Sequence, residues 1–413
     1  MNIKKHDPIK VYSAIRFASA LLFSVIVTVN LVDEATVVGL NPLQLVLVGT
    51  MLETVSFLFE VPTGIVADVY SRKLSVIIGL LLIGLGFTVE GLFPTFIAIL
   101  VAQVIWGFGF TFVSGAREAW IADEIGEDKA GKAFSKGSQM SLVGSFIGIA
   151  ISMALANINI RLPIILGGFL YSCQSVYLWL FMPENNFHPT PISKRETFGA
   201  MKNTLMTGIK LIKASPVLLT IILAGLIFGM FSEGFDRLWT PFMINNFTFP
   251  EIWNLKPVIW FGILAMIANA LAILAVRFAE KKTDTNNHKS TVTTLLIVNG
   301  VLALAVMAFG LSGNFMMAAV AYWMVSMFRE ARGPIYDAWT NQNLEPRVRA
   351  TVFSMCSQAN AVGQIAGGPL LGFIATAVSL RLSLILAGVF LIPSLFLYTN
   401  SIKKHKLIDP AIA

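Results

Sequence analysis

The chain has 413 residues, of which 56% are apolar and only 13% are charged, and its formal net charge is +7. This composition excludes an ordinary soluble domain and is typical of an integral membrane protein. The basic residues are dispersed over short segments between long apolar runs, so they do not indicate a nucleic-acid surface. The sequence has no metal-ligand spacing and no nucleophile beside a base, so we expect neither an enzyme nor a bound cofactor.

Twelve apolar segments are each long enough to cross the roughly 30 Å of hydrocarbon in a bilayer. They form two sets of six, which a linker over residues 184–215 separates. The sequence therefore predicts an all-α membrane protein with one six-helix bundle over residues 1–183 and another over residues 216–413. The expected spans cover residues 11–31, 43–67, 74–91, 95–121, 133–156, 162–182, 217–239, 258–279, 291–311, 315–341, 351–378 and 382–400.

The distribution of positive charge predicts the orientation of these spans. Of the 30 Lys and Arg residues, 22 fall on the side of the two termini, four on the opposite side and four inside the spans. Because positive loops stay in the cytoplasm, we expect a multi-pass protein of the cell membrane with both termini cytoplasmic. The linker has a helical apolar face that predicts either an amphipathic helix on the cytoplasmic leaflet or a passive tether. This face consists of Phe198, Met201, Leu205, Ile209 and Ile212.

An internal repeat supports the division into two bundles. A constant offset of 219 residues aligns spans 4 and 5 with spans 10 and 11, as expected for two bundles related by an axis along the membrane normal. Glycines at four-residue spacing recur in the two copies, and they predict close helix approach. The offset maps Glu118-Ala119-Trp120 onto Asp337-Ala338-Trp339, Phe134-Ser135 onto Phe353-Ser354, and Gly144 and Gly148 onto Gly363 and Gly367.

Ionisable residues inside the spans are candidates for function because each costs a few kcal/mol or more to bury in hydrocarbon. At about 1.5 Å per residue, Glu53, Glu233 and Arg329 lie roughly 20–25 Å from the cytoplasmic end of their spans. Arg332 lies slightly shallower and shares a helix face with Arg329. Opposite charges at one depth suggest a shared cavity in which protonation of a carboxylate would free an arginine, or else a static ion pair. Trp323 is among the large side chains near this expected cavity.

A second group of charges lies nearer the cytoplasm, at a depth of roughly 5–12 Å. We expect it to form a cytoplasmic gate network in which charges exchange partners when the bundles move. Arg16 could instead serve helix packing alone. The group contains Arg16, Glu60, Arg117, Glu118 and Asp337, with Asp68 at its mouth.

Residues 64–73, GIVADVYSRK, resemble the loop between helices 2 and 3 of the major facilitator superfamily. The resemblance implies that Asp68, Arg72 and Lys73 belong to a gate latch between two halves of a transporter. Together with SGAREAWIADE and RATVFSMCSQ, the chain looks closest to bacterial permeases of the tetracycline or macrolide efflux type. In AQVIWGFG, Gln103 occupies the place where such antiporters usually carry an arginine.

These features predict a secondary active transporter that works by alternating access between the two bundles. The resemblance favours efflux of a bulky amphiphilic compound against inward proton flow, with the proton gradient as the energy source. An alternative is a proton-coupled importer of a small nutrient, in which Arg329 and Arg332 would hold an anionic substrate. A membrane sensor without transport is a third class. We expect a monomer whose partners are a small-molecule substrate and the lipid bilayer, without nucleic acid.

Overall fold

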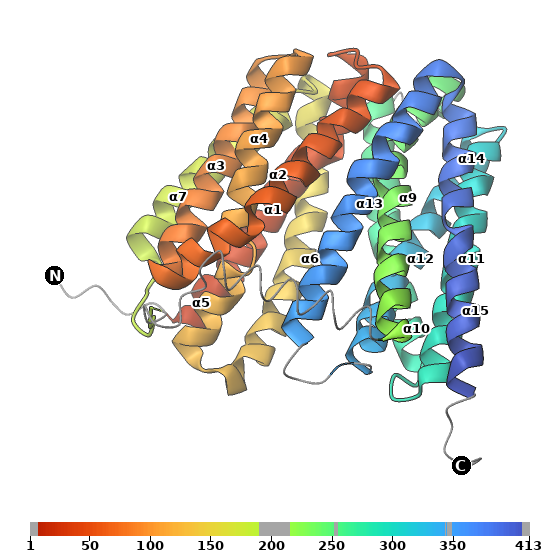
Figure 1. Ribbon diagram of the computed structural model, residues 1–413. Coiled ribbons are helices and arrows are strands. Elements are labelled where there is room, and N and C mark those ends of the chain that lie inside the picture. The colour runs from red at the N-terminus through yellow and green to blue at the C-terminus, as the bar shows by residue number, and fades with distance from the viewer. Residues whose placement is uncertain (1–6, 190–214, 252–254, 343, 345–348, 407–413) are drawn as a thin grey trace. The chain divides into compact units, whose positions relative to one another are not determined.

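The computed structural model describes residues 7–189, 215–251, 255–342, 344 and 349–406. The amphipathic helix expected over residues 198–212 of the linker lies outside the described residues. Every regular element within the described part of the chain is helical (Figure 1). These are α1 (Pro8–Thr36), α2 (Pro42–Val69), α3 (Arg72–Leu92), α4 (Phe96–Val113), α5 (Ala116–Ile125), α6 (Glu127–Ile158), α7 (Leu162–Phe181), α9 (Pro216–Asn246), α10 (Pro257–Lys282), α11 (His288–Leu311), α12 (Phe315–Gln342), α13 (Arg349–Ala377), α14 (Leu380–Phe390) and α15 (Ile392–Lys406).

The twelve expected spans are all present as helices, which confirms the all-α membrane architecture. Ten helical segments of the described chain are long and apolar enough to cross a membrane. The other two expected spans are α12 and α13, which are more polar because α12 contains four charged residues in its second half and α13 contains the stretch SMCSQAN. The first of these polar helices supplies several candidate site residues.

The expected span over residues 95–121 consists of two helices, α4 and α5. The helices separate at Ser114 and Gly115, where Gly115 has a φ of 75°. That backbone conformation favours glycine because a side chain would be strained there. A second glycine with positive φ, Gly126 at 86°, joins α5 to α6. Glycines in this conformation therefore mark both ends of α5.

Short polar side chains begin many of the helices by accepting hydrogen bonds from free backbone N–H groups. Asp7 accepts from the N–H of Ile9 at 3.0 Å, and Ser71 accepts from the N–H of Leu74 at 2.9 Å. Thr95, Ser215, Asn287 and Ser379 have the same role at α4, α9, α11 and α14. The helix starts thus follow from local sequence.

The described helices form two compact units. Unit 1 contains α1, most of α2, α3 to α7 and the start of α10, whereas unit 2 contains the first turns of α2, the rest of α10, α9 and α11 to α15. In unit 1, α1 packs on α6, and α3 packs on α4 and α7; in unit 2, α9 packs on α13, and α11 packs on α12, α14 and α15 (Figure 1). Equivalent spans therefore pack in both units, as an internal repeat requires. The bundle boundaries at residues 183 and 216 stay a prediction.

Glycines allow the closest of these packings, as the four-residue spacing predicted. A Cβ atom on Gly144 would lie 2.4 Å from the carbonyl oxygen of Phe17, and one on Gly148 would lie 2.3 Å from that of Leu21. In unit 2 a Cβ atom on Gly363 would lie 2.1 Å from the carbonyl oxygen of Leu226. The helices α1 and α6, and likewise α9 and α13, are therefore in backbone contact where only a glycine fits.

A pair of alanine substitutions on α6 tests this packing. Gly144→Ala should destabilise the protein by about 1–3 kcal/mol because its new methyl group collides with backbone that cannot rotate away. Gly131→Ala is the matched control, because no atom lies within 4 Å of its added Cβ. In the control, alanine should be neutral or should stabilise the helix by about 0.5–1 kcal/mol. Thermal unfolding in detergent measures both, and equal melting temperatures would contradict the close contact.

Candidate substrate cavity and charged networks

Unit 1 contains a cavity of about 380 Å³. Its lining combines large aromatic rings with charged and hydroxyl groups, which is the usual composition of a small-molecule site. The residues come from α1, α3, the α4–α5 segment, α6 and α7, so the cavity lies within the bundle of unit 1. They are Arg16, Ser19, Ala20, Phe23, Leu80, Ile83, Trp106, Phe110, Val113, Ser114, Gly115, Arg117, Glu118, Ser141 and Tyr171.

Hydrogen bonds from α6 and α7 fix the part of α1 that carries Arg16. Ser141 donates its hydroxyl to the carbonyl oxygen of Arg16 at 3.3 Å, and Tyr171 donates to that of Ser19 at 2.7 Å. Gln174 donates an amide N–H to the hydroxyl of Ser19 at 3.0 Å. Tyr171 is buried, so its hydroxyl needs this acceptor. These hydrogen bonds therefore hold the backbone of α1 in place at Arg16 and Ser19, two residues that line the cavity.

Three charges stand together at one end of the cavity. The guanidinium of Arg117 donates to Glu118 at 3.0 and 3.1 Å, and the guanidinium of Arg16 donates to the same carboxylate oxygen at 3.3 Å. Two arginines share one carboxylate, so this end of the cavity carries one net positive charge. The side chains are 17–36% exposed. The structure thus brings together three residues of the predicted gate group, Arg16, Arg117 and Glu118.

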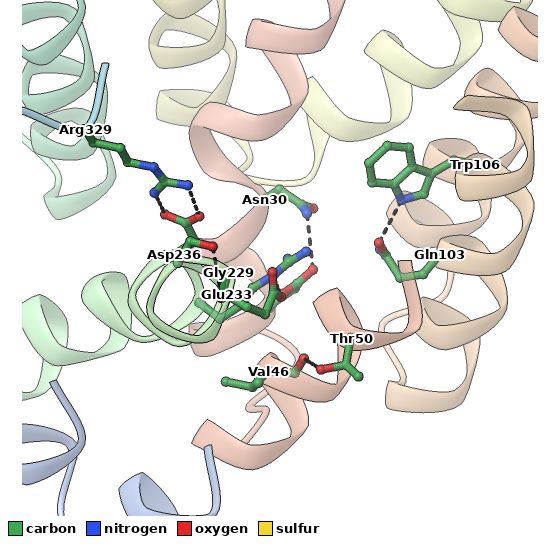
Figure 2. A network of polar contacts seen from close by, with 12 residues as sticks. Asn30, Val46, Thr50, Gln103, Trp106, Gly229, Glu233, Asp236 and Arg329 are labelled. Atoms are coloured by element: carbon green, nitrogen blue, oxygen red, sulfur yellow. Dashed lines mark hydrogen bonds and ion pairs between the residues drawn. The ribbon is translucent and has the colours of Figure 1, made fainter. Parts of the chain in front are cut away.

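An aromatic cluster forms another wall of the same cavity. The ring of Trp106 stacks on that of Phe87 with centroids 5.1 Å apart and an interplanar angle of 24°. The ring centroid of Phe23 lies 6.5 Å from that of Trp106 and 6.4 Å from that of Phe87. The indole N–H donates to the side-chain oxygen of Gln103 at 2.8 Å (Figure 2). An aromatic ligand can therefore meet a broad π surface here.

Buried acidic residues gather where α1 and α3 end, far along the bundle from Arg16. Asp33 and Glu90 are each 2% exposed. Arg161, between α6 and α7, lies with Nε 3.7 Å from Oδ2 of Asp33 and donates through Nη2 to the carbonyl oxygen of Glu90 at 3.3 Å. The carboxylate of Glu90 also accepts from Gln103 at 3.2 Å. Unit 1 thus has charged groups at both ends.

The latch expected from the resemblance has a definite geometry within unit 1. Arg72 at the start of α3 lies 3.6 Å from Asp68 and 3.1 Å from Asp123 of α5, so it bridges three helices. The backbone N–H of Lys73 donates to Glu184 at 2.8 Å, and the hydroxyl of Ser71 donates to the same carboxylate at 2.6 Å. The chain that leaves α7 is therefore attached to the start of α3. The gating role of these residues stays a prediction.

In unit 2 a line of side chains joins α9 to α12. Arg329 donates to Asp236 through two parallel hydrogen bonds, of which the one from Nη2 to Oδ2 is 2.7 Å (Figure 2). Trp239, one turn further along α9, stacks on Tyr322 with centroids 4.3 Å apart. Paired bonds of this kind hold a guanidinium in one plane. The two helices are thus joined by long side chains at this level.

Arg332 occupies a different environment on the same helix. It is 6% exposed, and its guanidinium lies 4.0 Å from the ring centroid of Phe228 and 4.4 Å from that of Tyr336. Arg329 lies 5.9 Å from the same Phe228 ring, so both arginines share one face of α12, as the sequence predicted. Tyr336 donates its hydroxyl to the carbonyl oxygen of Ile221 at 2.7 Å. Aromatic faces therefore hold Arg332 in place.

The remaining predicted residues lie on α2, α9 and α12. Glu53 is half-buried on α2 in unit 1, whereas Glu233 is buried on α9 in unit 2. Glu233 accepts from Nε of Arg237 at 3.1 Å, so its ion-pair partner is not Arg329. A common cavity for these acids stays a prediction. Trp323 is half-buried on α12, and Glu60 and Asp337 are exposed on α2 and α12, respectively.

Several residues of these networks had escaped the sequence reasoning. Asp236 lies inside its predicted span three residues after Glu233, and Glu90 lies inside the span over residues 74–91, so intramembrane charge alone could have identified both. Asp33 and Asp123 each follow a predicted span by two residues. The charge count places Arg237 on the side opposite the termini, at the end of the span expected over residues 217–239, whereas α9 continues to Asn246. No sequence signal pointed to Glu184.

Comparison with known proteins decides the family. The model of the Major Facilitator Superfamily matches residues 12–330. The chain belongs to this superfamily. A curated relative is the uncharacterized MFS-type transporter YxaM of Bacillus subtilis (strain 168), which is 26% identical over 392 residues and 94% covered in both chains. This chain of the major facilitator superfamily is therefore a secondary transporter of a small molecule and not an enzyme.

Solved structures show the same fold. A bacterial homologue of the human lysosomal transporter Spinster, inward-facing and unoccupied, aligns with a TM-score of 0.74 at 16% identity over 98% of both chains. A mutant of the nucleoside transporter NupG aligns with a TM-score of 0.77 at 13% identity, over 96% of this chain and all of that one. A POT family transporter in complex with a thioalcohol-conjugated peptide aligns at 0.72 and 12% identity, over 95% and 96%. At such identities the likeness concerns the fold.

Proposed function

We propose that this transporter exports an aromatic, amphiphilic compound in exchange for protons. The cavity of unit 1 supports the proposal because it combines a π-surface around Trp106 with a net positive end at Arg16, Arg117 and Glu118. A ligand with an aromatic body and an anionic or zwitterionic end satisfies both features. The volume of the cavity, about 380 Å³, falls within the usual range for small-molecule sites.

Proton coupling requires a carboxyl group whose charge changes during the cycle. Glu53 and Glu233 are the proposed coupling residues, since both are at least half-buried on helices of the transporter. In unit 2 the carboxylate of Glu233 accepts a hydrogen bond from Arg237, so protonation of Glu233 would weaken this ion pair within the bundle. Alternating access would then follow from the change of ion pairs between two states.

Flux into proteoliposomes of purified full-length protein tests the proposal. The probes are 5-carboxyfluorescein, an aromatic anion, and ethidium, an aromatic cation. Under an interior-acid pH gradient, an antiporter should accumulate the anionic probe as protons leave. An importer that carries substrate together with protons should accumulate it only under the opposite gradient. Glu53→Gln and Glu233→Gln should abolish gradient-driven accumulation and should preserve downhill exchange if both groups couple.

A tryptophan pair tests whether the cavity of unit 1 binds the probe. Trp106→Ala should lower the affinity for 5-carboxyfluorescein about two- to tenfold because the stacking surface is lost. Trp179→Ala is the matched control, since Trp179 lies on α7 of the same unit with 65% of its surface exposed. Affinity is measured by equilibrium dialysis in nanodiscs. If both variants bind like the wild type, the cavity is not the site of the probe.

A second candidate function is import of a small anionic nutrient. The environment of Arg332 favours import. This buried arginine forms no ion pair with any of the described residues. A carboxylate or phosphate on the substrate would supply the missing negative charge. Accumulation of a small anion under an interior-alkaline gradient, lost in Arg332→Gln, would favour import over efflux.

A further inference from the structure

A chain of hydrogen bonds leads from the cavity wall into the interior of unit 1. The indole N–H of Trp106 donates to Oε1 of Gln103 at 2.8 Å, and Nε2 of Gln103 donates to Oε2 of Glu90 at 3.2 Å. Figure 2 shows Trp106 and Gln103 joined in this way. Gln103 is 1% exposed and Glu90 is 2% exposed. The sequence had singled out Gln103 only as a difference from drug antiporters.

The chemistry of the three groups fixes the direction of the chain. An indole N–H can only donate, so it must face the oxygen of the Gln103 amide. The amide nitrogen therefore faces Glu90, which must accept. An ionised carboxylate does this well, because a hydrogen bond to a charged acceptor is roughly twice as strong as a neutral one. The charge of Glu90 thus supports the orientation of both other side chains.

Helix α3 holds the indole at two points. Phe87 stacks on Trp106 at 5.1 Å, and Glu90, three residues later on the same face of α3, holds it through Gln103. Two charged groups also lie near Glu90: Arg161 donates to its backbone carbonyl, and Asp33 pairs with Arg161. Gln103 connects the carboxylate of Glu90 to Trp106 in the cavity wall.

We propose that Glu90 is a positioning residue that controls the aromatic wall of the cavity through Gln103 and Trp106. A proton on Oε2 of Glu90 turns a charged acceptor into an O–H group, which can donate. When this O–H group donates to Gln103, the amide turns its oxygen toward Glu90, and its NH₂ group comes to face the indole N–H. Two donors cannot bond to each other, so Trp106 leaves its place against Phe87. A proton on the other carboxyl oxygen weakens the chain by removing the charge.

This inference rests on the proposed function in one respect, namely that an aromatic ligand uses Trp106. Protonation of Glu90 and binding of such a ligand would then oppose each other, as thermodynamic linkage requires. Uptake of a proton at Glu90 would release an aromatic substrate, and ligand binding would release the proton. That is the relation an exchange of substrate for protons needs.

Tryptophan fluorescence tests the control by Glu90 without any substrate. The protein has eight tryptophans, and the difference between the spectra of wild type and Trp106→Phe isolates the emission of Trp106. In nanodiscs, this difference spectrum should shift to longer wavelength as the pH falls, because the indole leaves an apolar stack. Glu90→Gln should give a difference spectrum that does not change with pH, because the amide cannot titrate.

Two further variants keep the test independent of folding defects. Gln103→Leu should also abolish the pH response, because it cuts the chain while Glu90 remains. Asp33→Asn is the matched control. Asp33 is as buried as Glu90 and lies at the same end of the bundle, but it pairs with Arg161, so the pH response of Trp106 should persist in this variant. Thermal unfolding first establishes that each variant is folded. The spectrum of each variant is then compared with that of the same variant carrying Trp106→Phe in addition. A pH response that survives in Glu90→Gln, or an absent response in the wild type, overturns the inference.

The same proteins separate this inference from the proposed function. Affinity for 5-carboxyfluorescein should fall about two- to tenfold at low pH in the wild type and stay constant in Glu90→Gln. If Trp106→Ala binds the probe normally while the fluorescence response persists, the control by Glu90 stands and the cavity is not the probe site. If the response is absent while Trp106→Ala loses affinity, the cavity stands and the control by Glu90 fails.

Discussion

Replacing Arg161 by leucine should lower the free energy of unfolding by about 3–5 kcal/mol, toward the lower end because the arginine side chain is 19% exposed. The change leaves the carboxylate of Asp33 without its guanidinium, 3.7 Å away in the native protein, although Asp33 is only 2% exposed. It also removes the donor to the carbonyl of Glu90. Loss of monodispersity or a melting temperature lower by several degrees is the expected observation in detergent.

The double variant Asp33→Asn/Arg161→Leu identifies the cause of that loss. It removes the buried charge along with its partner, so it should recover a large part of the stability. Asp33→Asn alone should cost less than Arg161→Leu, because the guanidinium that it leaves behind reaches solvent more easily than the carboxylate does. If the double variant is as unstable as Arg161→Leu, the ion pair does not account for the effect.

The second large effect concerns transport. Arg329→Gln and Asp236→Asn should each reduce gradient-driven accumulation of the probe by about tenfold or more, since each leaves an uncompensated charge between α9 and α12. The cost in unfolding free energy should be only about 1 kcal/mol or less, because the side chain of Asp236 is 41% exposed. Loss of flux with retained melting temperature would therefore separate a functional role from a structural one.

Exchange of the two charges provides the control for this pair. Asp236→Arg/Arg329→Asp restores opposite charges on the two helices, so it should transport better than either single variant. The double-mutant cycle measures the coupling between the positions. Glu330→Gln is a matched single change, because Glu330 is adjacent on α12 but exposed. Single variants with wild-type flux would place the ion pair outside the transport cycle.

The sequence alone determined the twelve spans, the family and the close packing at Gly144 and Gly363. These features can be read from short stretches of sequence. A span needs roughly 20 consecutive apolar residues to cross the bilayer, and a close contact between two helix backbones needs a glycine, which has no side chain. The same rules also located intramembrane charge, including Arg329 and Glu233.

Only the tertiary structure decided which charges pair. Asp236, not Glu233, meets Arg329, and Glu118 joins Arg16 from a helix about a hundred residues earlier. Helix rotation sets these partners, and rotation depends on packing against several neighbours at once, which an apolar run does not encode. The same reason hid the bond from Trp106 through Gln103 to Glu90, since it depends on how α3 and α4 face each other.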